Sequence, residues 1–236
     1  MSEQTTLSRY NKSVDVLNMP ARIKQLPVSP LGWPTPWFVT WFDRDGKPCE
    51  DGVGIPDFRV VNPDKIMTAV KKNLCWVCGQ PKSAAFHAFV IGPMCAVNRV
   101  ISEPSGHRDC QIFSARICPF LSRPNMVRNE KGMPGGLKEP AGFGLKRNPG
   151  AVCVWITKSF RPFNPVRGQP GILFSLGLPV EVLWFAEGKR ATRKQVLDSI
   201  ESGFPALEKL AREEGHQALR ALATQREVAM QFIPDA

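Results

Sequence analysis

Several features that mark common protein classes are missing from this sequence of 236 residues. No uninterrupted apolar run approaches the roughly 18 residues that a membrane-spanning helix needs. The first residues, Met1-Ser-Glu-Gln-Thr-Thr6, contain neither the basic segment nor the apolar segment of a secretion signal. These absences predict a soluble protein of the cytoplasm.

Motifs for catalysis and nucleotide binding are also scarce. The chain has no Gly-x-x-x-x-Gly-Lys-Ser/Thr loop, and no Gly-x-Gly-x-x-Gly follows an expected strand. With only three His in the chain, the Ser and Cys residues lack identifiable His and acid partners for nucleophilic catalysis. The sequence therefore favours a protein that is not an enzyme.

Cysteine is the residue type that carries the strongest signal. The chain contains seven Cys, an odd number, and no export signal, which favours metal ligands and free thiols over disulfides. Cys75-Trp-Val-Cys78-Gly79 is followed by His107-Arg-Asp-Cys110, and two such pairs are typical of a tetrahedral zinc site. We predict that Cys75, Cys78, His107 and Cys110 bind a structural zinc ion, because four protein ligands complete its coordination.

Two alternatives to this ligand set remain open at the level of sequence. Cys95 or Cys118 can replace His107, or both can be buried thiols beside the site. Alternatively, the whole cluster consists of reduced Cys with no metal. Gly79 suits the tight turn that a Cys-x-x-Cys pair makes around a metal, since it lets backbone N–H groups approach the Cys78 sulfur.

The elements expected around the ligands resemble a treble-clef zinc finger over roughly residues 73–120. We expect a knuckle at the first pair and a hairpin whose strands, Ala88–Ile91 and Ala96–Ile101, flank Gly92-Pro93. A helix from about His107 to Ile117 follows, and Pro119 prevents its extension.

The fold class that we predict is α+β, with a small treble-clef-like zinc module embedded in a mixed β-sheet protein that ends in helices. We predict four segments. Residues 1–72 form an N-terminal arm, a hairpin and a helix, and residues 73–121 form the zinc module. Residues 122–150 form a basic loop rich in Pro and Gly, and residues 151–236 form a basic β-hairpin region with C-terminal helices.

Individual elements follow from local patterns. Residues 1–30 resemble an extended arm, and strands are expected at residues 36–42 and 58–61. Asn62 and Pro63 predict the start of a helix that runs to about residue 72. Strands at 152–159 and 172–176 are expected to pair, with a further strand at 180–185. Thr192 and Gln195 form a capping-box pattern, and we expect helices at about 193–203, 205–214 and 216–231.

The net charge of +10 is concentrated in the middle of the chain. Residues 116–194 contain 14 Lys/Arg and 4 Asp/Glu, so this block alone accounts for the excess. A polyanion is therefore the first partner to consider, and the block also contains aromatic residues for base stacking. The residues that we predict to contact phosphates are Arg123, Arg128, Lys131, Lys146, Arg147, Lys158, Arg161, Arg167, Lys189, Arg190, Arg193 and Lys194.

A solvated basic surface, or a patch that binds an acidic protein, explains the same charges without nucleic acid. The aromatic residues of the block lie in strand-like runs, where core packing is their usual role.

Two longer stretches resemble a known family. They are the run from Phe89 to Leu121, with Gly92-Pro-Met-Cys95, Ser105-Gly-His-Arg-Asp-Cys110 and Cys118-Pro-Phe-Leu121, and the run from Val182 to Gly203. Both are similar to a family of uncharacterised proteins from bacteriophages, prophages and bacteria. The resemblance implies a phage or mobile-element context and carries no activity.

These observations lead to three functional hypotheses. The first is a zinc-stabilised, non-catalytic protein that binds DNA or RNA or acts as an accessory factor. The second is a phage modulator that binds a host protein complex. The third is a His-Asn-His metal nuclease, for which His87, Asn98 and His107 occur in the required order, although Phe86 replaces the usual Asp before His87.

Overall fold

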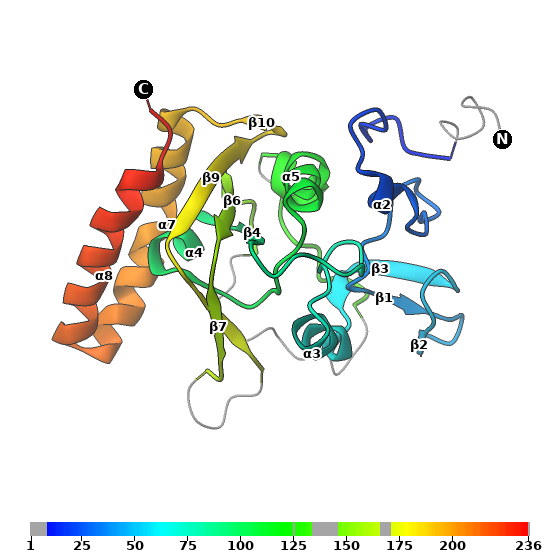
Figure 1. The fold of residues 1–236 in the computed structure, drawn as a ribbon, viewed down its shortest axis with the longest axis horizontal. Coiled ribbons are helices and arrows are strands. Elements are labelled where there is room, and N and C mark those ends of the chain that lie inside the picture. Colours follow the sequence, from blue (N-terminus) through cyan, green and yellow to red (C-terminus); the bar gives the residue numbers. More distant parts are fainter. Residues whose placement is uncertain (1–8, 125, 134–145, 166–170, 236) are drawn as a thin grey trace.

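The computed structural model describes residues 9–124, 126–133, 146–165 and 171–235. The chain combines helices with three small sheets in which every strand pair is antiparallel. The N-terminal arm and one sheet lie at one side of the molecule, and the C-terminal helices lie at the other (Figure 1). This arrangement confirms the predicted α+β class.

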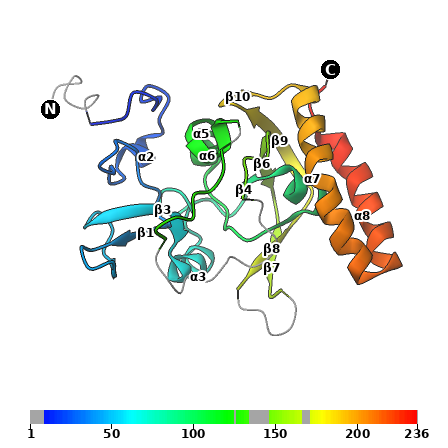
Figure 2. The ribbon, with the colours of Figure 1, turned by 180° about the vertical axis from the view of Figure 1, so that it is seen from behind.

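A four-stranded sheet lies between these two sides (Figures 1 and 2). Its strands, in spatial order, are β10 (Lys189–Arg190), β9 (Pro179–Ala186), β6 (Val152–Thr157) and β4 (His87–Ile91). All six residues of β6 are buried, which indicates that both faces of the sheet are covered.

Different helices cover the two faces of this sheet. On one face, Trp155 of β6 belongs to a buried cluster with Val196 and Ile200 of helix α7 (Arg193–Glu214). On the other face, Val154 packs in a cluster with Ala115 of helix α5 (Arg108–Ile117). The alternation of side chains along a strand therefore divides the core into two layers.

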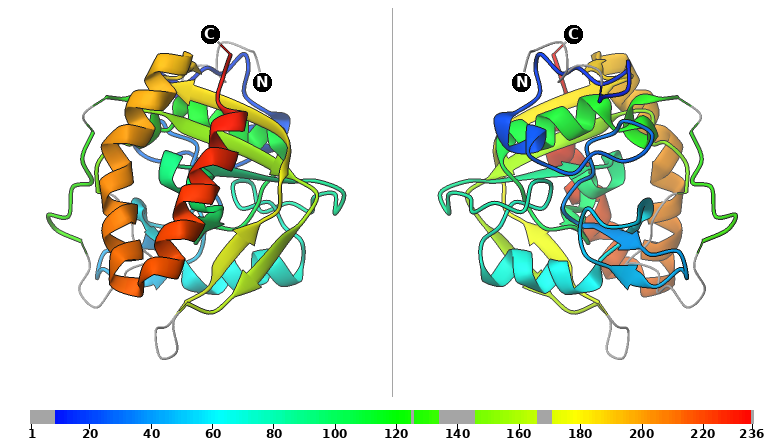
Figure 3. Two further views of the ribbon diagram at one scale, coloured as in Figure 1. Left: turned by 90° about the vertical axis from the view of Figure 1, so that its left-hand side faces the viewer. Right: turned by 90° about the vertical axis from the view of Figure 1, so that its right-hand side faces the viewer.

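The C-terminal helices form an antiparallel pair across the sheet (Figure 3, left). Thr192 and Gln195 make the predicted capping box at the start of α7. The predicted helix end near Gly203 is wrong, since α7 continues to Glu214 with Pro205 inside it. Gly203 serves close packing instead, because a Cβ there would lie 3.0 Å from Cγ of Met94. Helix α8 (His216–Ala229) and a short 3-10 turn, η1 (Met230–Phe232), complete the chain.

The predicted pairing of residues 152–159 with 172–176 is wrong. β6 pairs with β9, whereas β7 (Phe160–Phe163) pairs with β8 (Leu173–Leu176) in a second sheet that includes β5 (Val100–Ile101). The chain turns between β6 and β7, where the Thr157 hydroxyl accepts a hydrogen bond from the Ser159 N–H. A local side-chain bond of this kind favours a turn over a continuous strand.

The predicted hairpin around Gly92-Pro93 is also wrong. Residues Pro93–Asn98 form helix α4, which separates β4 from β5. Pro93 occupies the first helical turn, where its missing N–H has no intrahelical partner to lose. Arg99 ends the helix in the left-handed region at φ 55°.

The N-terminal side contains the third sheet, in which β1 (Val39–Phe42) lies between β2 (Pro48–Cys49) and β3 (Ile55–Val61). Helix α3 (Pro63–Lys71) follows, capped by Asn62 as predicted. The arm before this sheet is folded, in contrast to the extended arm that we expected. It contains helix α2 (Ala21–Lys24) and crosses α5 (Figure 3, right). No helix in the described part of the chain is both long enough and apolar enough to cross a lipid bilayer.

Candidate metal centre

The first two predicted ligands lie on a tight knuckle that follows α3. Cys75 N–H donates to the Gln80 carbonyl at 2.8 Å, and Gly79 N–H donates to the Cys75 carbonyl at 2.8 Å. Gly79 has φ 71°, and a Cβ at this position would lie 2.6 Å from Cγ of Trp37. The turn therefore requires glycine both for its conformation and for its packing.

The other two ligands lie at the start of α5. His107 is the residue before the helix, and Cys110 lies in its first turn. Because the two residues are three positions apart, which is close to one helical turn, their side chains lie on the same side of α5. Gly106 lets this helix approach the knuckle, since a Cβ there would lie 3.1 Å from the Cys75 sulfur. The His107 backbone N–H also donates to that sulfur at 3.3 Å.

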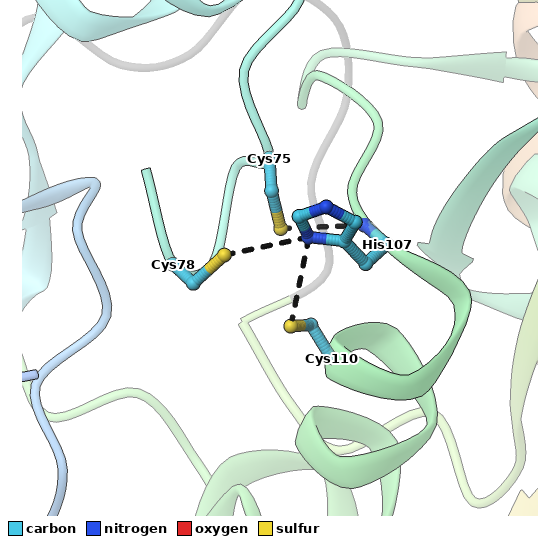
Figure 4. A group of neighbouring side chains, drawn as sticks. All are labelled: Cys75, Cys78, His107 and Cys110. Carbon is cyan, nitrogen blue, oxygen red and sulfur yellow. Dashed lines mark hydrogen bonds between the residues drawn. The ribbon is translucent and has the colours of Figure 1, made fainter. Parts of the chain in front are cut away.

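The structure brings these four side chains together around one point (Figure 4). Their ligand atoms all lie within 4.8 Å of one another. His107 Nδ1 is 3.4 Å from Cys78 Sγ and 3.9 Å from Cys110 Sγ. Tetrahedral bonds of about 2.3 Å to sulfur and about 2.05 Å to nitrogen place those atoms about 3.6 Å apart. The four residues therefore lie close enough to bind a metal ion.

The His107 ring is oriented for ligation through Nδ1. Its other nitrogen, Nε2, lies 3.1 Å from the Pro81 carbonyl oxygen, which can only accept a hydrogen bond. This contact assigns the proton to Nε2 and leaves the Nδ1 lone pair directed at the sulfurs. Hydrogen bonds of this kind to the second ring nitrogen are typical of metal-binding His residues.

Three sulfur atoms in a buried site also have unequal proton affinities. Hydrogen bonds from the Cys110 and Cys78 side chains hold the pKa of Cys75 well below its usual range. Hydrogen bonds with Cys75, and next with Cys78, raise the pKa of Cys110. Without a cation, the cluster thus favours a thiolate at Cys75 and protonated neighbours, whereas a bound cation favours three thiolates.

The N-terminal arm covers the cluster. Tyr10, Met19 and Ile23 belong to the same buried group as Cys75, Cys78, Cys110 and Phe113. The contact is tied by an ion pair between Arg22 and Asp109 at 2.6 Å, and by a hydrogen bond from Gln80 to Gln25 at 2.8 Å. Sequence reasoning missed this role of the arm, although its apolar residues recur among polar ones.

The rival ligands Cys95 and Cys118 do not belong to this group of four. Cys95 lies in α4, where burial raises its pKa to about 11, and burial also raises the pKa of Cys118 at the end of α5. Both are therefore protonated thiols near neutral pH. Cys153 is fully buried in β6 and serves as a small apolar core residue.

The residues of the nuclease hypothesis do not form a second site. His107 lies in the cluster above, and the Asn98 side chain accepts a hydrogen bond from the Val100 N–H, as a local turn residue. His87 lies on β4, where its Nδ1 is 3.1 Å from Nζ of Lys82. Within the described residues, no other group of three or more potential ligands surrounds a cation position.

The predicted phosphate-contacting residues occupy more than one surface. Lys158, in the turn after β6, and Arg161, in β7, are exposed, whereas Lys189 and Arg190 lie beside the opposite end of β6. Five steps along β6 separate these ends by about 17 Å, at about 3.3 Å per residue. The Lys and Arg residues that we predicted to contact phosphates therefore do not lie in a single small surface patch.

Several of the other predicted residues have partners within the chain. Arg128 donates to the Arg59 carbonyl, Arg147 to Ser202, and Arg193 to the Pro234 carbonyl. Lys146 pairs with Glu130, Lys194 pairs with Asp198, and Arg190 lies over the Phe185 ring. Arg123 and Lys131 are exposed, while Arg167 lies outside the described residues.

No family model, curated protein or solved structure matches this chain.

Proposed function

We propose that this chain is a zinc-stabilised, non-catalytic protein that binds nucleic acid or assists a nucleic-acid process. The zinc centre holds the arm and the knuckle in place, and the basic turn between β6 and β7 contacts phosphates. The phage or mobile-element context belongs to the same proposal and rests on the sequence motifs alone.

Zinc is the metal that this donor set suits best. Three Cys sulfurs and one imidazole nitrogen form a closed set of four soft and intermediate ligands, which is typical of structural zinc. Metal analysis of the purified protein is expected to give one zinc per chain, and Cys110→Ser is expected to lose it. Retention of one zinc by that variant would overturn the ligand assignment.

The observation that carries nucleic-acid binding is the charge of the segment around β6, β7 and β8. Residues 140–180 contain five Lys/Arg and no Asp/Glu. Of these, Lys158 and Arg161 are exposed, and neither makes an ion pair with any described residue. Unpaired cations on a strand-and-turn surface are available to phosphates, whose counterions are released on binding.

The test is binding of the purified protein to labelled duplex DNA, single-stranded DNA and RNA over a salt series, with magnesium present. We expect affinity to fall as salt rises, with a logarithmic slope of about 0.9 per phosphate for duplex DNA and about 0.7 for single strands. We also expect the probes to remain intact. Cleavage would favour the nuclease hypothesis instead.

A pair of double variants sharpens this test. Lys158→Glu with Arg161→Glu is expected to weaken binding by about tenfold or more, because two contacts become repulsive. Lys209→Glu with Arg220→Glu makes the same change of charge on the exposed surfaces of α7 and α8 and serves as the control. Equal effects of the two pairs, or no effect of the first, would reject this surface. Absence of all binding at low salt would favour a protein partner.

A further inference from the structure

One end of the four-stranded sheet carries exposed apolar side chains beside cations. The last paired row at this end consists of His87 of β4, Thr157 of β6 and Pro179 of β9. The next residues outward along these three strands are Phe86, Lys158 and Leu178. Phe86 is 50% exposed and Leu178 is 58% exposed. Val180, near the same end of β9, is 51% exposed.

The exposed ring of Phe86 is the unusual member of this group. A Phe side chain gains about 1.5–3 kcal/mol from full burial, so half-exposure forgoes part of that stabilisation. Single exposed apolar residues are common, but here three lie at the sheet end that also carries Lys158. An aromatic ring beside cations is the arrangement with which proteins stack an unpaired base and hold its phosphates.

A second cation is held in a fixed position beside His87, the residue that follows Phe86 in the chain. The Lys82 ammonium donates to Asn73 Oδ1 at 2.6 Å and lies 3.1 Å from His87 Nδ1. Burial, together with the charge of Lys82, lowers the pKa of His87 to about 4, so the ring is neutral and accepts a hydrogen bond near neutral pH. The ring is itself anchored by an edge contact with Phe160 at 4.7 Å.

This ammonium feels the charge of the Cys75 thiolate, but it has no carboxylate partner in the part of the chain that the structure describes. The closest carboxylate along β9, Glu181, is paired with Arg108 at 2.7 Å. A half-buried cation that lacks a carboxylate is suited to an anion supplied by a ligand.

Building on the proposed function, we propose that this sheet end binds single-stranded nucleic acid, with one base stacked on Phe86 and neighbouring phosphates on Lys158 and Lys82. The base faces of a duplex are already stacked on each other, so an exposed aromatic ring gains contact only with an unstacked base. Leu178 and Val180 offer apolar surface to the same nucleotide or its neighbour.

The experiment compares Phe86→Ala with Phe58→Ala, a matched control at another exposed Phe, which is 43% exposed on β3. Binding of each variant to oligo-dT, oligo-U and a DNA duplex is measured at one salt concentration. Phe86→Ala is expected to weaken oligo-dT or oligo-U binding between about fivefold and about 150-fold, with duplex binding unchanged. Phe86→Trp is expected to restore the affinity.

The outcomes separate this inference from the proposed function. If Phe86→Ala leaves single-strand binding unchanged, or weakens duplex binding equally, the stacking site is rejected while nucleic-acid binding stands. If wild-type protein binds no nucleic acid at low salt, both proposals fail. The DNA and RNA oligonucleotides determine which single strand is preferred.

A second variant tests the phosphate contact. Lys82→Gln is expected to reduce the logarithmic salt slope for single strands by about 0.7, the value for one lost phosphate contact. Lys72→Gln, at an exposed position just after α3, is expected to leave the slope unchanged. Metal content is measured for both, so that a disturbed knuckle is recognised. An unchanged slope in Lys82→Gln with full metal content would reject this contact.

Discussion

The metal region and the sheet region of this protein are stabilised by different means. The metal region comprises the arm, the knuckle and the outer face of α5, and three of the nine buried residues in its cluster are the Cys ligands themselves. The sheet region comprises the four-stranded sheet with α4, α7 and α8, and its core contains large side chains such as Phe89, Trp155 and Trp184. Apolar burial stabilises the sheet region, whereas under the proposed function a zinc cross-link stabilises the metal region.

Helix α5 belongs to both regions. Its residues Cys110 and Phe113 face the arm, and Ala115 faces the sheet. Two surfaces of one helix thus belong to different regions, and the arm can detach only if α5 stays on the sheet without it.

Removing the metal is the change with the largest expected effect. In zinc-finger peptides, structural zinc contributes an apparent free energy of about 10–16 kcal/mol. Chelation, or Cys75→Ala, is expected to expose the amides of residues 10–33 and 75–80 to hydrogen exchange while the amides of β6 stay protected. Cys49→Ser is the control, since Cys49 lies outside the cluster. Simultaneous exchange of β6 would show one cooperative unit and contradict the comparison.

A substitution that creates a cavity in the sheet region tests whether this region is stabilised by apolar burial alone. Trp155 is 1% exposed, and its indole N–H donates to the Gly177 carbonyl at 3.0 Å. Trp155→Ala is expected to lower the free energy of unfolding by about 3–5 kcal/mol, measured in urea, with metal content unchanged. Trp155→Phe keeps most of the volume and is expected to cost less. Loss of metal from folded Trp155→Ala protein would show that the regions are coupled.

A smaller effect is expected from pH at the border between the two regions. The folded-state pKa of His87, about 4, lies below its ordinary value of 6.5 because the ring is buried near Lys82. Its contribution to stability is therefore present above pH 6.5 and is lost as pH falls toward 4. NMR titration of His87 checks the value. Lys82→Gln is expected to raise it while leaving it below 6.5, since burial persists; an unchanged value would contradict the charge effect.

The parts of the fold that the sequence predicts are those with local chemical causes. Asn62 and Pro63 start α3, and Thr192 with Gln195 caps α7, because each cap is made within a few residues. The clustering of Cys75, Cys78, His107 and Cys110 joins two pairs that are distant in the sequence, and it was predictable because each pair has the residue types and the spacing of metal ligands. The metal that occupies the cluster remains a prediction.

The parts that sequence reasoning missed depend on distant partners. By sequence alone Gly203 resembles a helix end, but it lies inside α7 because Met94 of α4 packs closely against it. The pairing of β6 with β9 depends on a turn at Ser159. Residues 96–101 resemble a strand by composition, but Pro93 begins a helix that runs to Asn98. The arm has too little periodicity to indicate that it folds over α5.

The position of β4 has a consequence for dissecting this protein. β4 lies between the two halves of the metal cluster in the sequence, yet it pairs along its whole length with β6, from His87 with Thr157 to Ile91 with Cys153. A synthetic peptide of residues 73–121 would keep every ligand and lose that partner strand. Transfer of this centre to another protein is therefore expected to require β6 as well, in contrast to an isolated zinc finger.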